Sequence, residues 1–127
     1  MQRKKVLLVD DSEAVLMLER LILQTDYDII TASDGRTAIA KALVDRPDLI
    51  VLDLVMPEMD GLEVCKTLRS QEATRRTPIV MLTSQVEWAS MKAGYLHGCA
   101  AYLTKPVEGP RLLAKVKLLL KKAGDRR

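Results

Sequence analysis

The sequence predicts an α/β fold, a (βα)5 arrangement in which a doubly wound parallel sheet of five strands is covered by helices on both faces. Five short runs rich in Leu, Ile and Val alternate with segments of helical periodicity, as in consecutive βαβ units. Several of these runs are almost continuously apolar, which is typical of strands buried on both faces. A length of 127 residues is enough for one such domain.

The strands are expected in the five apolar runs. They read KVLLV, DIITA, DLIVLDL, PIVMLT and AAYLTK, at residues 5–9, 28–32, 48–54, 78–83 and 100–105. The sequence shows no internal repeat, low-complexity tract or linker, so it predicts one domain over residues 1–127. The core of this domain is expected at residues 5–120, with 121–127 forming a frayed tail or the start of a linker.

The first helix is expected between the first two strands. Its predicted buried stripe consists of Val15, Leu16, Leu18, Leu21 and Ile22, which lie at near-helical spacing. The charged residues Glu13, Glu19 and Arg20 are expected elsewhere on the surface of this helix.

The four later helices are marked by their ends. Residues 34–47 begin at turn residues and stop before Pro47, residues 60–71 follow another turn, and residues 87–98 end at Gly98, a suitable left-handed C-cap. The last helix, over 111–122, places on one stripe its residues Leu112, Leu113, Val116, Leu119 and Leu120. Trp88 is expected to pack or to join a partner-binding patch, and His97 to be structural.

The composition argues against several classes of protein. The formal net charge is +3 and aromatic residues make up 3%, so no platform for nucleic acid is predicted. Cys65 and Cys99 have no paired spacing, and we expect two free thiols rather than a disulfide or a zinc site. The apolar run after the basic N-terminus is too short for a signal peptide or a membrane span. The sequence therefore predicts a cytoplasmic protein.

Reactive polar side chains stand where the predicted strands end. In chain order they are Asp10 and Asp11, then Ser33 and Asp34, then Asp53, then Thr83 and Ser84, and finally Lys105. Ligands of open parallel sheets bind beyond the carboxyl ends of the strands, at the point where the strand order reverses. In the common order 2-1-3-4-5, strands 1 and 3 are neighbours at that point. Their three aspartates are therefore expected to converge, beside Thr83 and Lys105.

The charge of this cluster points to a divalent cation. Three carboxylates carry −3 and Lys105 supplies +1, so one divalent ion makes the cluster neutral. Oxygen ligands suit Mg²⁺, which commonly uses one or two carboxylates and binds phosphate oxygens. An aspartate in such a site can attack phosphorus and form an aspartyl phosphate. A second interpretation stays open: Asp10 and Asp11 are solvated, and Asp10 forms a capping box with Glu13.

The sequence resembles the receiver domain of two-component response regulators over residues 5 to about 120. The resemblance is carried by VDDS at 9–12, DLVMPEMDGLEV at 53–64, PIVMLTS at 78–84 and AAYLTKP at 100–106. It implies a flavodoxin-like fold with strand order 2-1-3-4-5, and Asp53 as the phosphoacceptor. It also implies a bound Mg²⁺ ion, whose ligands would be Asp10, Asp11, Asp53 and the backbone carbonyl of Val55.

The resemblance further implies roles for residues around the acceptor. Thr83 would hydrogen-bond the phosphoryl group and move toward it on activation, and Lys105 would pair with a phosphoryl oxygen. The bond between Lys105 and Pro106 is expected to be cis, and Tyr102 is expected to turn inward when Thr83 moves. The face made by the fourth helix, the fifth strand and the fifth helix would then change shape and recruit a partner.

Some positions depart from the family pattern. Val107 follows Lys-Pro where Phe is usual, so packing under the site is expected to differ. Val55 and Gln85 lie two positions after the acceptor and the threonine, where side chains influence attack of water on the acyl phosphate. An apolar Val55 cannot orient that water, and slow self-dephosphorylation is therefore expected.

The expected function is that of a phosphorylation-activated binding module. It would take a phosphoryl group from a phosphohistidine of a sensor histidine kinase or phosphotransfer protein, catalyse that transfer itself, and bind a downstream effector protein. A phosphorylation-linked homodimer is a further option, although Arg111 stands where the family often has an acidic residue on the dimer surface. Direct binding of nucleic acid or of a membrane is not expected.

Two other functions compete with this one. One is a Mg²⁺-dependent phosphohydrolase of the haloacid-dehalogenase type, which would show an Asp-x-Asp pattern at the nucleophile. Here Val55 occupies the place of the second acid, so a turnover enzyme is not expected. A pseudo-receiver, which binds partners and never accepts phosphate, is the alternative within the family. The sequence fits both a stand-alone regulator and the N-terminal part of a longer protein.

Overall fold

The computed structural model describes residues 3–84 and 98–125, which contain one parallel sheet of five strands. The strands are β1 (Lys5–Val9), β2 (Asp28–Ala32), β3 (Leu49–Asp53), β4 (Ile79–Thr83) and β5 (Ala101–Thr104). Their order is β2-β1-β3-β4-β5, and every neighbouring pair is parallel. The predicted fold class and strand order are confirmed.

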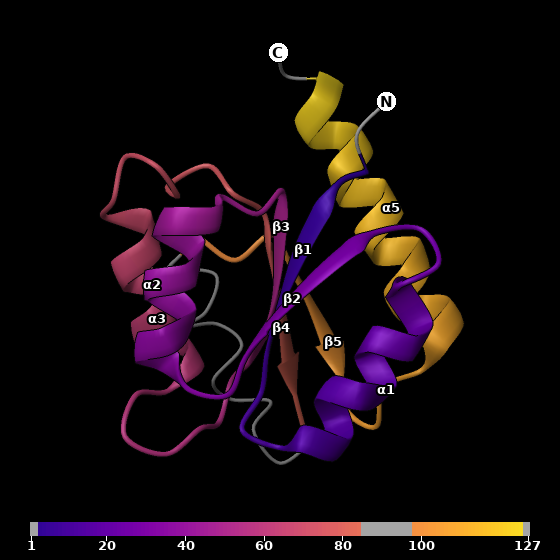
Figure 1. Cartoon of the computed structure of the whole chain (residues 1–127), viewed down its shortest axis with the longest axis horizontal. Coiled ribbons are helices and arrows are strands. Elements are labelled where there is room, and N and C mark those ends of the chain that lie inside the picture. The colour runs from indigo at the N-terminus through magenta and orange to yellow at the C-terminus, as the bar shows by residue number, and fades with distance from the viewer. Residues whose placement is uncertain (1–2, 85–97, 126–127) are drawn as a thin grey trace.

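Helices cover both faces of the sheet. They are α1 (Glu13–Leu23), α2 (Gly35–Asp45), α3 (Gly61–Arg69) and α5 (Gly109–Asp125). Figure 1 shows α2 and α3 on one face and α1 and α5 on the other. The helix predicted over 87–98 lies outside the described residues apart from Gly98, and so do Gln85, Trp88 and His97. Gly98 has the left-handed φ of +84° that suits a helix C-cap.

The start of α1 is set by a hydroxyl cap. Ser12 is the N-cap, and its side chain accepts a hydrogen bond from the backbone N–H of Val15 at 3.3 Å. The capping-box interpretation of Asp10 with Glu13 is wrong, because Asp10 precedes the cap and Glu13 is the first helical residue. The carboxyl group of Asp10 is thereby left for another role.

The strands divide the interior into two cores, because side chains alternate between the two faces of a sheet. The α2/α3 core takes from the strands Leu7, Val9, Ile50, Leu52, Ile79 and Met81. The α1/α5 core takes from them Val6, Leu8, Leu49, Val51, Val80 and Leu82. The nearly continuous apolar runs of β1, β3 and β4 thus serve two buried faces, as predicted.

The face that α1 buries differs from the predicted stripe. Leu18 and Leu21 are 44% and 61% exposed, whereas the fully or nearly buried residues of the helix are Leu16, Glu19 and Leu23. Positions 16, 19 and 23 are spaced by three and four, so they lie on one side of a helix. The expectation that Glu19 lies on the surface is therefore wrong, and a carboxyl group enters the α1/α5 core.

The apolar stripe of α5 agrees with the prediction. Leu112 and Val116 are fully buried. Three partly buried residues of the helix pack against the same core: Leu113, Leu119 and Leu120. The helix continues to Asp125, five residues beyond the expected end of the core at residue 120. Within residues 3–84 and 98–125, no helix is both long and apolar enough to cross a membrane.

Candidate functional site

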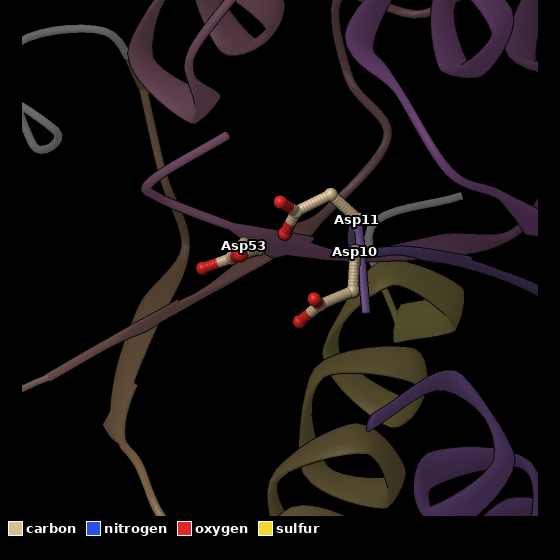
Figure 2. A group of neighbouring side chains, drawn as sticks. All are labelled: Asp10, Asp11 and Asp53. Atoms are coloured by element: carbon tan, nitrogen blue, oxygen red, sulfur yellow. The ribbon is translucent and has the colours of Figure 1, made fainter. Parts of the chain in front are cut away.

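Two neighbouring strands bring the aspartates together. Asp10 directly follows β1, and Asp53 is the last residue of β3. Val9 pairs with Leu52 in the register of the two strands, so the next residues along, Asp10 and Asp53, come side by side. Figure 2 shows their carboxyl groups gathered with that of Asp11 at one end of the sheet. The predicted convergence of the three aspartates is found in the structure.

Lys105 joins the two buried aspartates. Its Nζ lies 3.1 Å from Asp10 Oδ2 and 3.1 Å from Asp53 Oδ1. Asp10 is 1% exposed and Asp53 is 4% exposed, and the lysine reaches them from the residue after β5. Removing carboxylates from water is costly unless they are paired, and one ammonium shared between two of them offsets part of that cost.

Backbone amides orient the same two carboxylates. The N–H of Ser12 donates to Asp10 Oδ1 at 2.9 Å, and the N–H of Val55 donates to Asp53 Oδ1 at 3.3 Å. Each donor lies two residues after its aspartate, which is the local pattern of an Asx turn. The chain that leaves each strand therefore holds the carboxyl group at the end of that strand.

The site holds more negative charge than one lysine neutralises. Burial raises the pKa of Asp53 above its usual value, and the Asp10 carboxylate adds to the rise, while Lys105 opposes it. Burial alone would lower the pKa of Lys105, but the Asp53 and Asp10 carboxylates outweigh it and raise that pKa. Lys105 is thus a permanent cation at neutral pH, and the carboxylates favour a further cation beside them.

The three aspartates suit a hard divalent cation. One carboxylate oxygen from each of Asp10, Asp11 and Asp53 lies within 4.8 Å of the others. Asp11 is exposed, so the group is open to solvent on that side. A set of oxygen ligands with access to water fits Mg²⁺, which keeps several waters when it binds proteins. The residues present therefore fit the ion that the family resemblance implies.

A close backbone approach shapes the loop after β3. The N–H of Gly61 donates to the carbonyl of Leu54 at 2.8 Å, and a Cβ at Gly61 would collide with the backbone of Asp53 and Leu54. Only glycine fits such an approach, because backbone atoms cannot move aside. Residues 55–60 are therefore held in a closed loop at the site, and Val55 is the first of them.

The remaining predicted site residues lie on or after β4 and β5. Thr83 ends β4 and is fully buried, and its carbonyl accepts a hydrogen bond from the N–H of Lys105 at 2.8 Å. Tyr102 is partly buried in β5 and packs against the α2/α3 core. The peptide bond between Lys105 and Pro106 is cis. The strand that carries the threonine thus anchors the backbone of the lysine, while the switching roles of Thr83 and Tyr102 stay predictions.

Two further positions singled out in the sequence lie apart from the carboxylate group. Asp34 is exposed and caps α2, where its carboxylate accepts a hydrogen bond from the N–H of Thr37 at 2.7 Å. That bond lowers the pKa of Asp34. Val107, which stands where the family usually has Phe, is partly buried and packs against the α1/α5 core.

One buried acid near the site, Glu19, was not predicted from the sequence. Glu19 has no exposed surface, and its carboxyl oxygens have no hydrogen-bond partner in the described parts of the chain. Burial raises its pKa to about 8, and the Asp10 carboxylate adds to the rise. The neutral form of Glu19 is therefore favoured at pH 7. The available signal was its spacing from Leu16 and Leu23, since residues three and four apart share a helix face.

Comparisons with known proteins agree on one family. A family model described as "Response regulator receiver domain" matches residues 6–117. The chain is similar to the alkaline phosphatase synthesis transcriptional regulatory protein PhoP of Bacillus subtilis, at 44% identity over 94% of this chain and 50% of that protein. It is also similar to protein PilG of Pseudomonas aeruginosa, at 35% identity over 89% of this chain and 84% of that protein.

Solved structures have the same fold. The chemotaxis protein CheY4 of Vibrio cholerae matches with a TM-score of 0.86 and 38% identity, over 91% of this chain and 98% of that one. A receiver domain protein from Methanospirillum hungatei matches with a TM-score of 0.92 and 25% identity, over 99% of this chain and 100% of that one. The chain spans half the length of PhoP, and 26% of the length of the response regulator PleD of Caulobacter vibrioides.

Proposed function

The chain belongs to the response regulator receiver family, and we propose that it is a phosphorylation-activated switch whose acceptor is Asp53. Receiver domains are signalling domains and not turnover enzymes. The observation that carries the proposal is the position of Lys105, whose Nζ lies 3.1 Å from both Asp10 and Asp53. These contacts join residues from the ends of β1, β3 and β5 in one polar site, where an incoming phosphoryl group would meet a nucleophile and a cation together.

The proposed donor is a phosphohistidine of a sensor histidine kinase or of a phosphotransfer protein. An oxygen of the ionised Asp53 carboxylate attacks phosphorus, so that an O–P bond forms while the P–N bond to the donor imidazole breaks. The imidazole leaves with the electron pair of that bond and takes up a proton. Lys105 then pairs with one phosphoryl oxygen, and the Thr83 hydroxyl donates a hydrogen bond to another.

Mg²⁺ is the proposed cofactor. Its ligands would be Asp10, Asp11, Asp53 and the backbone carbonyl of Val55. When bound there, the ion supplies positive charge opposite the phosphoryl oxygens. The proposal is supported by the three carboxylate oxygens within 4.8 Å of one another and by their uncompensated negative charge.

The proposed output is a change in the face that includes β5 and α5. Thr83 moves toward the phosphoryl group, Tyr102 turns inward, and an effector protein in the cytoplasm binds the altered face. A homodimer formed through α5 is a second option, which is less favoured because Arg111 stands where the family often has an acidic residue. In this chain Arg111 lies 3.7 Å from Glu108, the residue before α5, in an exposed ion pair.

We also propose that the phosphoryl group is lost slowly. Val55 lies two residues after Asp53 and is 52% exposed, and its apolar side chain cannot hydrogen-bond a water molecule and orient it toward the acyl phosphate. The phosphorylated lifetime should be long in the natural chain, stay long in Val55→Ala and Val55→Leu, and shorten in Val55→Asn. A lifetime that shortens in the Ala and Leu variants but not in Val55→Asn would contradict the proposal.

Intact-mass spectrometry after incubation with Mg²⁺ and acetyl phosphate tests the function. The natural chain is compared with Asp53→Asn, and with Asp26→Asn as a matched control because Asp26 is an exposed aspartate away from the site. We expect one added phosphoryl group in the natural chain and in Asp26→Asn. Asp53→Asn, and the natural chain with EDTA, should gain none.

The outcomes separate the receiver from its alternative. A folded natural chain that gains no phosphoryl group from acetyl phosphate or from a phosphorylated histidine kinase would favour the pseudo-receiver. If the Asp53→Asn variant still gains a phosphoryl group, the acceptor is a residue other than Asp53. Circular dichroism of each variant shows that the loss of the phosphoryl group is not a loss of fold.

A further inference from the structure

Cys65 and Cys99 lie in contact in the α2/α3 core, although 34 positions separate them in the sequence. Their sulfur atoms are 3.6 Å apart, and neither cysteine forms a disulfide bond. Cys65 lies on α3 without exposed surface, and Cys99 is 7% exposed in the segment that leads into β5. A disulfide bond is about 2.0 Å long, so a small approach of the two sulfur atoms would allow one to form.

Arg69 holds the segment of Cys99 against α3. Its Nε and Nη2 donate to the carbonyl of Gly98 at 3.1 and 2.8 Å, and its Nη1 donates to the carbonyl of Thr74 at 3.1 Å. Arg69 follows Cys65 by one helical turn, so the thiol and the arginine share one face of α3. The contact between the two sulfurs is therefore supported by a specific set of hydrogen bonds beside it.

The two thiols differ in how firmly they hold a proton. The hydrogen bond with Cys99 lowers the pKa of Cys65 against the effect of burial, and the Arg69 guanidinium lowers it further. The same hydrogen bond and burial raise the pKa of Cys99, while the Tyr102 hydroxyl acts in the opposite direction. Cys65 is thus the thiol that ionises first, and a thiolate is the form that reacts with oxidants.

We propose that Cys65 and Cys99 are a redox-sensitive modification site, which forms a reversible internal disulfide in the presence of a peroxide. The Cys65 thiolate attacks one peroxide oxygen, so that an S–O bond forms, the O–O bond breaks and hydroxide leaves to take a proton from solvent. Cys99 sulfur then attacks the Cys65 sulfenic acid, so that the S–S bond forms, the S–O bond breaks and water leaves with the Cys99 proton. Two thiols are oxidised, and one peroxide is reduced to two waters.

The surroundings of Cys99 give the oxidant its access. The residues on either side of it, Gly98 and Ala100, are both exposed, and Cys99 itself is 7% exposed whereas Cys65 is fully buried. The proposed route of hydrogen peroxide to the Cys65 thiolate therefore passes Cys99. The disulfide would tie α3 to the start of β5 and enclose the whole of β4 in a covalent loop. In a cytoplasmic protein such a bond is transient, which suits a sensor better than a structural link.

The first test uses the natural chain, in which these are the only two cysteines. After removal of reductant, the folded protein is treated with hydrogen peroxide, free thiols are alkylated in denaturant, and the digest is analysed by mass spectrometry. We expect a peptide pair that joins Cys65 to Cys99, and the return of both thiols after dithiothreitol. Survival of both thiols under conditions that oxidise free glutathione, or disulfides only between chains, would overturn the proposal.

A second test shows whether the fold creates the site. The chain is equilibrated with glutathione redox buffers in native buffer and in urea. We expect the equilibrium constant for the internal disulfide to be larger by about tenfold or more in the folded chain, because the fold raises the effective concentration of the thiols. An equal constant in both buffers would overturn the proposal, and this measurement needs no cysteine variant to fold.

Arginine variants supply the matched control for this second test. Arg69→Gln removes the hydrogen bonds to Gly98 and should reduce the ratio between the folded and unfolded equilibrium constants. Arg75→Gln changes an exposed arginine close in sequence and should leave the ratio unchanged. A ratio that is the same in Arg69→Gln and in the natural chain would contradict the role assigned to Arg69.

Discussion

The two faces of the sheet bury polar atoms in different ways. The α2/α3 core contains two thiols that contact each other, and the α1/α5 core contains the carboxyl group of Glu19, which has no hydrogen-bond partner among the described residues. A thiol packs like a small hydrophobic group, so its burial costs little. An unpaired carboxylate costs far more, and Glu19 is therefore buried in its neutral form. In the α2/α3 core the two thiols contact each other, and in the α1/α5 core the carboxyl group of Glu19 keeps its proton.

The two faces also differ in their connection to the acidic site. The charges of Asp10, Lys105 and Asp53 all act on the pKa of Glu19. The groups that act on the two thiols are each other, Arg69 and Tyr102. The carboxyl group of Glu19 thus interacts electrostatically with the acidic site. The two thiols of the α2/α3 core interact with each other and with their own neighbours instead.

Large cavities should affect the two cores alike. Leu68 lies in the α2/α3 core and Leu112 in the α1/α5 core, and neither has exposed surface. Leu68→Ala and Leu112→Ala should each lower the free energy of unfolding by about 2 to 5 kcal/mol, measured by urea denaturation. A loss well below this range in Leu112→Ala alone would mean that the core around Glu19 is loosely packed.

Replacing Glu19 should change how stability depends on pH. The folded pKa of about 8 lies above the ordinary value of 4.5, so between these values the folded chain keeps a proton that the unfolded chain has lost. The free energy of unfolding should therefore fall as pH rises through this window. Glu19→Gln should remove that part of the fall, about 2 to 3 kcal/mol between pH 5 and 7, in urea titrations with EDTA.

Glu13→Gln is the matched control for this titration, because Glu13 is an exposed glutamate on the same helix. Its pH profile should follow that of the natural chain. Parallel profiles for Glu19→Gln and the natural chain would show that Glu19 is ionised in the folded state, and the contrast between the two cores would then be lost.

Removing one thiol should have a smaller effect. Cys65→Ala deletes a single buried sulfur and should lower the free energy of unfolding by about 1 kcal/mol in the presence of reductant. Cys99→Ala should behave similarly. Because the two sulfurs share a contact, the double variant should lose less than the sum of the two single losses. A strictly additive loss would show that the contact contributes nothing to stability.

The smallest effect is expected on the outer side of α1. Leu21 is 61% exposed, and Leu21→Ala should change the free energy of unfolding by less than about 0.5 kcal/mol. Leu16, which is 5% exposed on the same helix, is the buried counterpart, and Leu16→Ala should cost about 2 kcal/mol or more. Equal losses of unfolding free energy in the two variants would mean that Leu21 is buried like Leu16, as the sequence predicted.

The sheet and the position of the aspartates were predictable from the sequence. Long apolar runs identify buried strands, and a parallel sheet places the end of each strand at one edge. The convergence of Asp10 and Asp53 therefore follows from the sequence. Lys105 also follows from this rule, since β5 runs parallel to the strands that carry the acids.

Other features depend on contacts that local patterns do not encode. Leu21 and Glu19 exchange their expected places because the rotation of α1 about its axis is set by packing on the sheet, and the sequence of the helix is compatible with more than one rotation. The contact between Cys65 and Cys99 spans 34 positions and depends on how the segment before β5 packs against α3. The Ser12 cap was missed because adjacent acidic and hydroxyl residues offer several caps, and only the helix start selects one.

Lys105 follows Asp10 by 95 positions, and this separation has a consequence for the newly made chain. During synthesis the two acids leave the ribosome long before the segment that forms β5. An unfinished chain therefore carries Asp10 and Asp53 without the ammonium group that lies 3.1 Å from each of them in the finished protein. The site comes into existence only when the last strand joins the sheet, so truncated products of translation lack it however well their first strands fold.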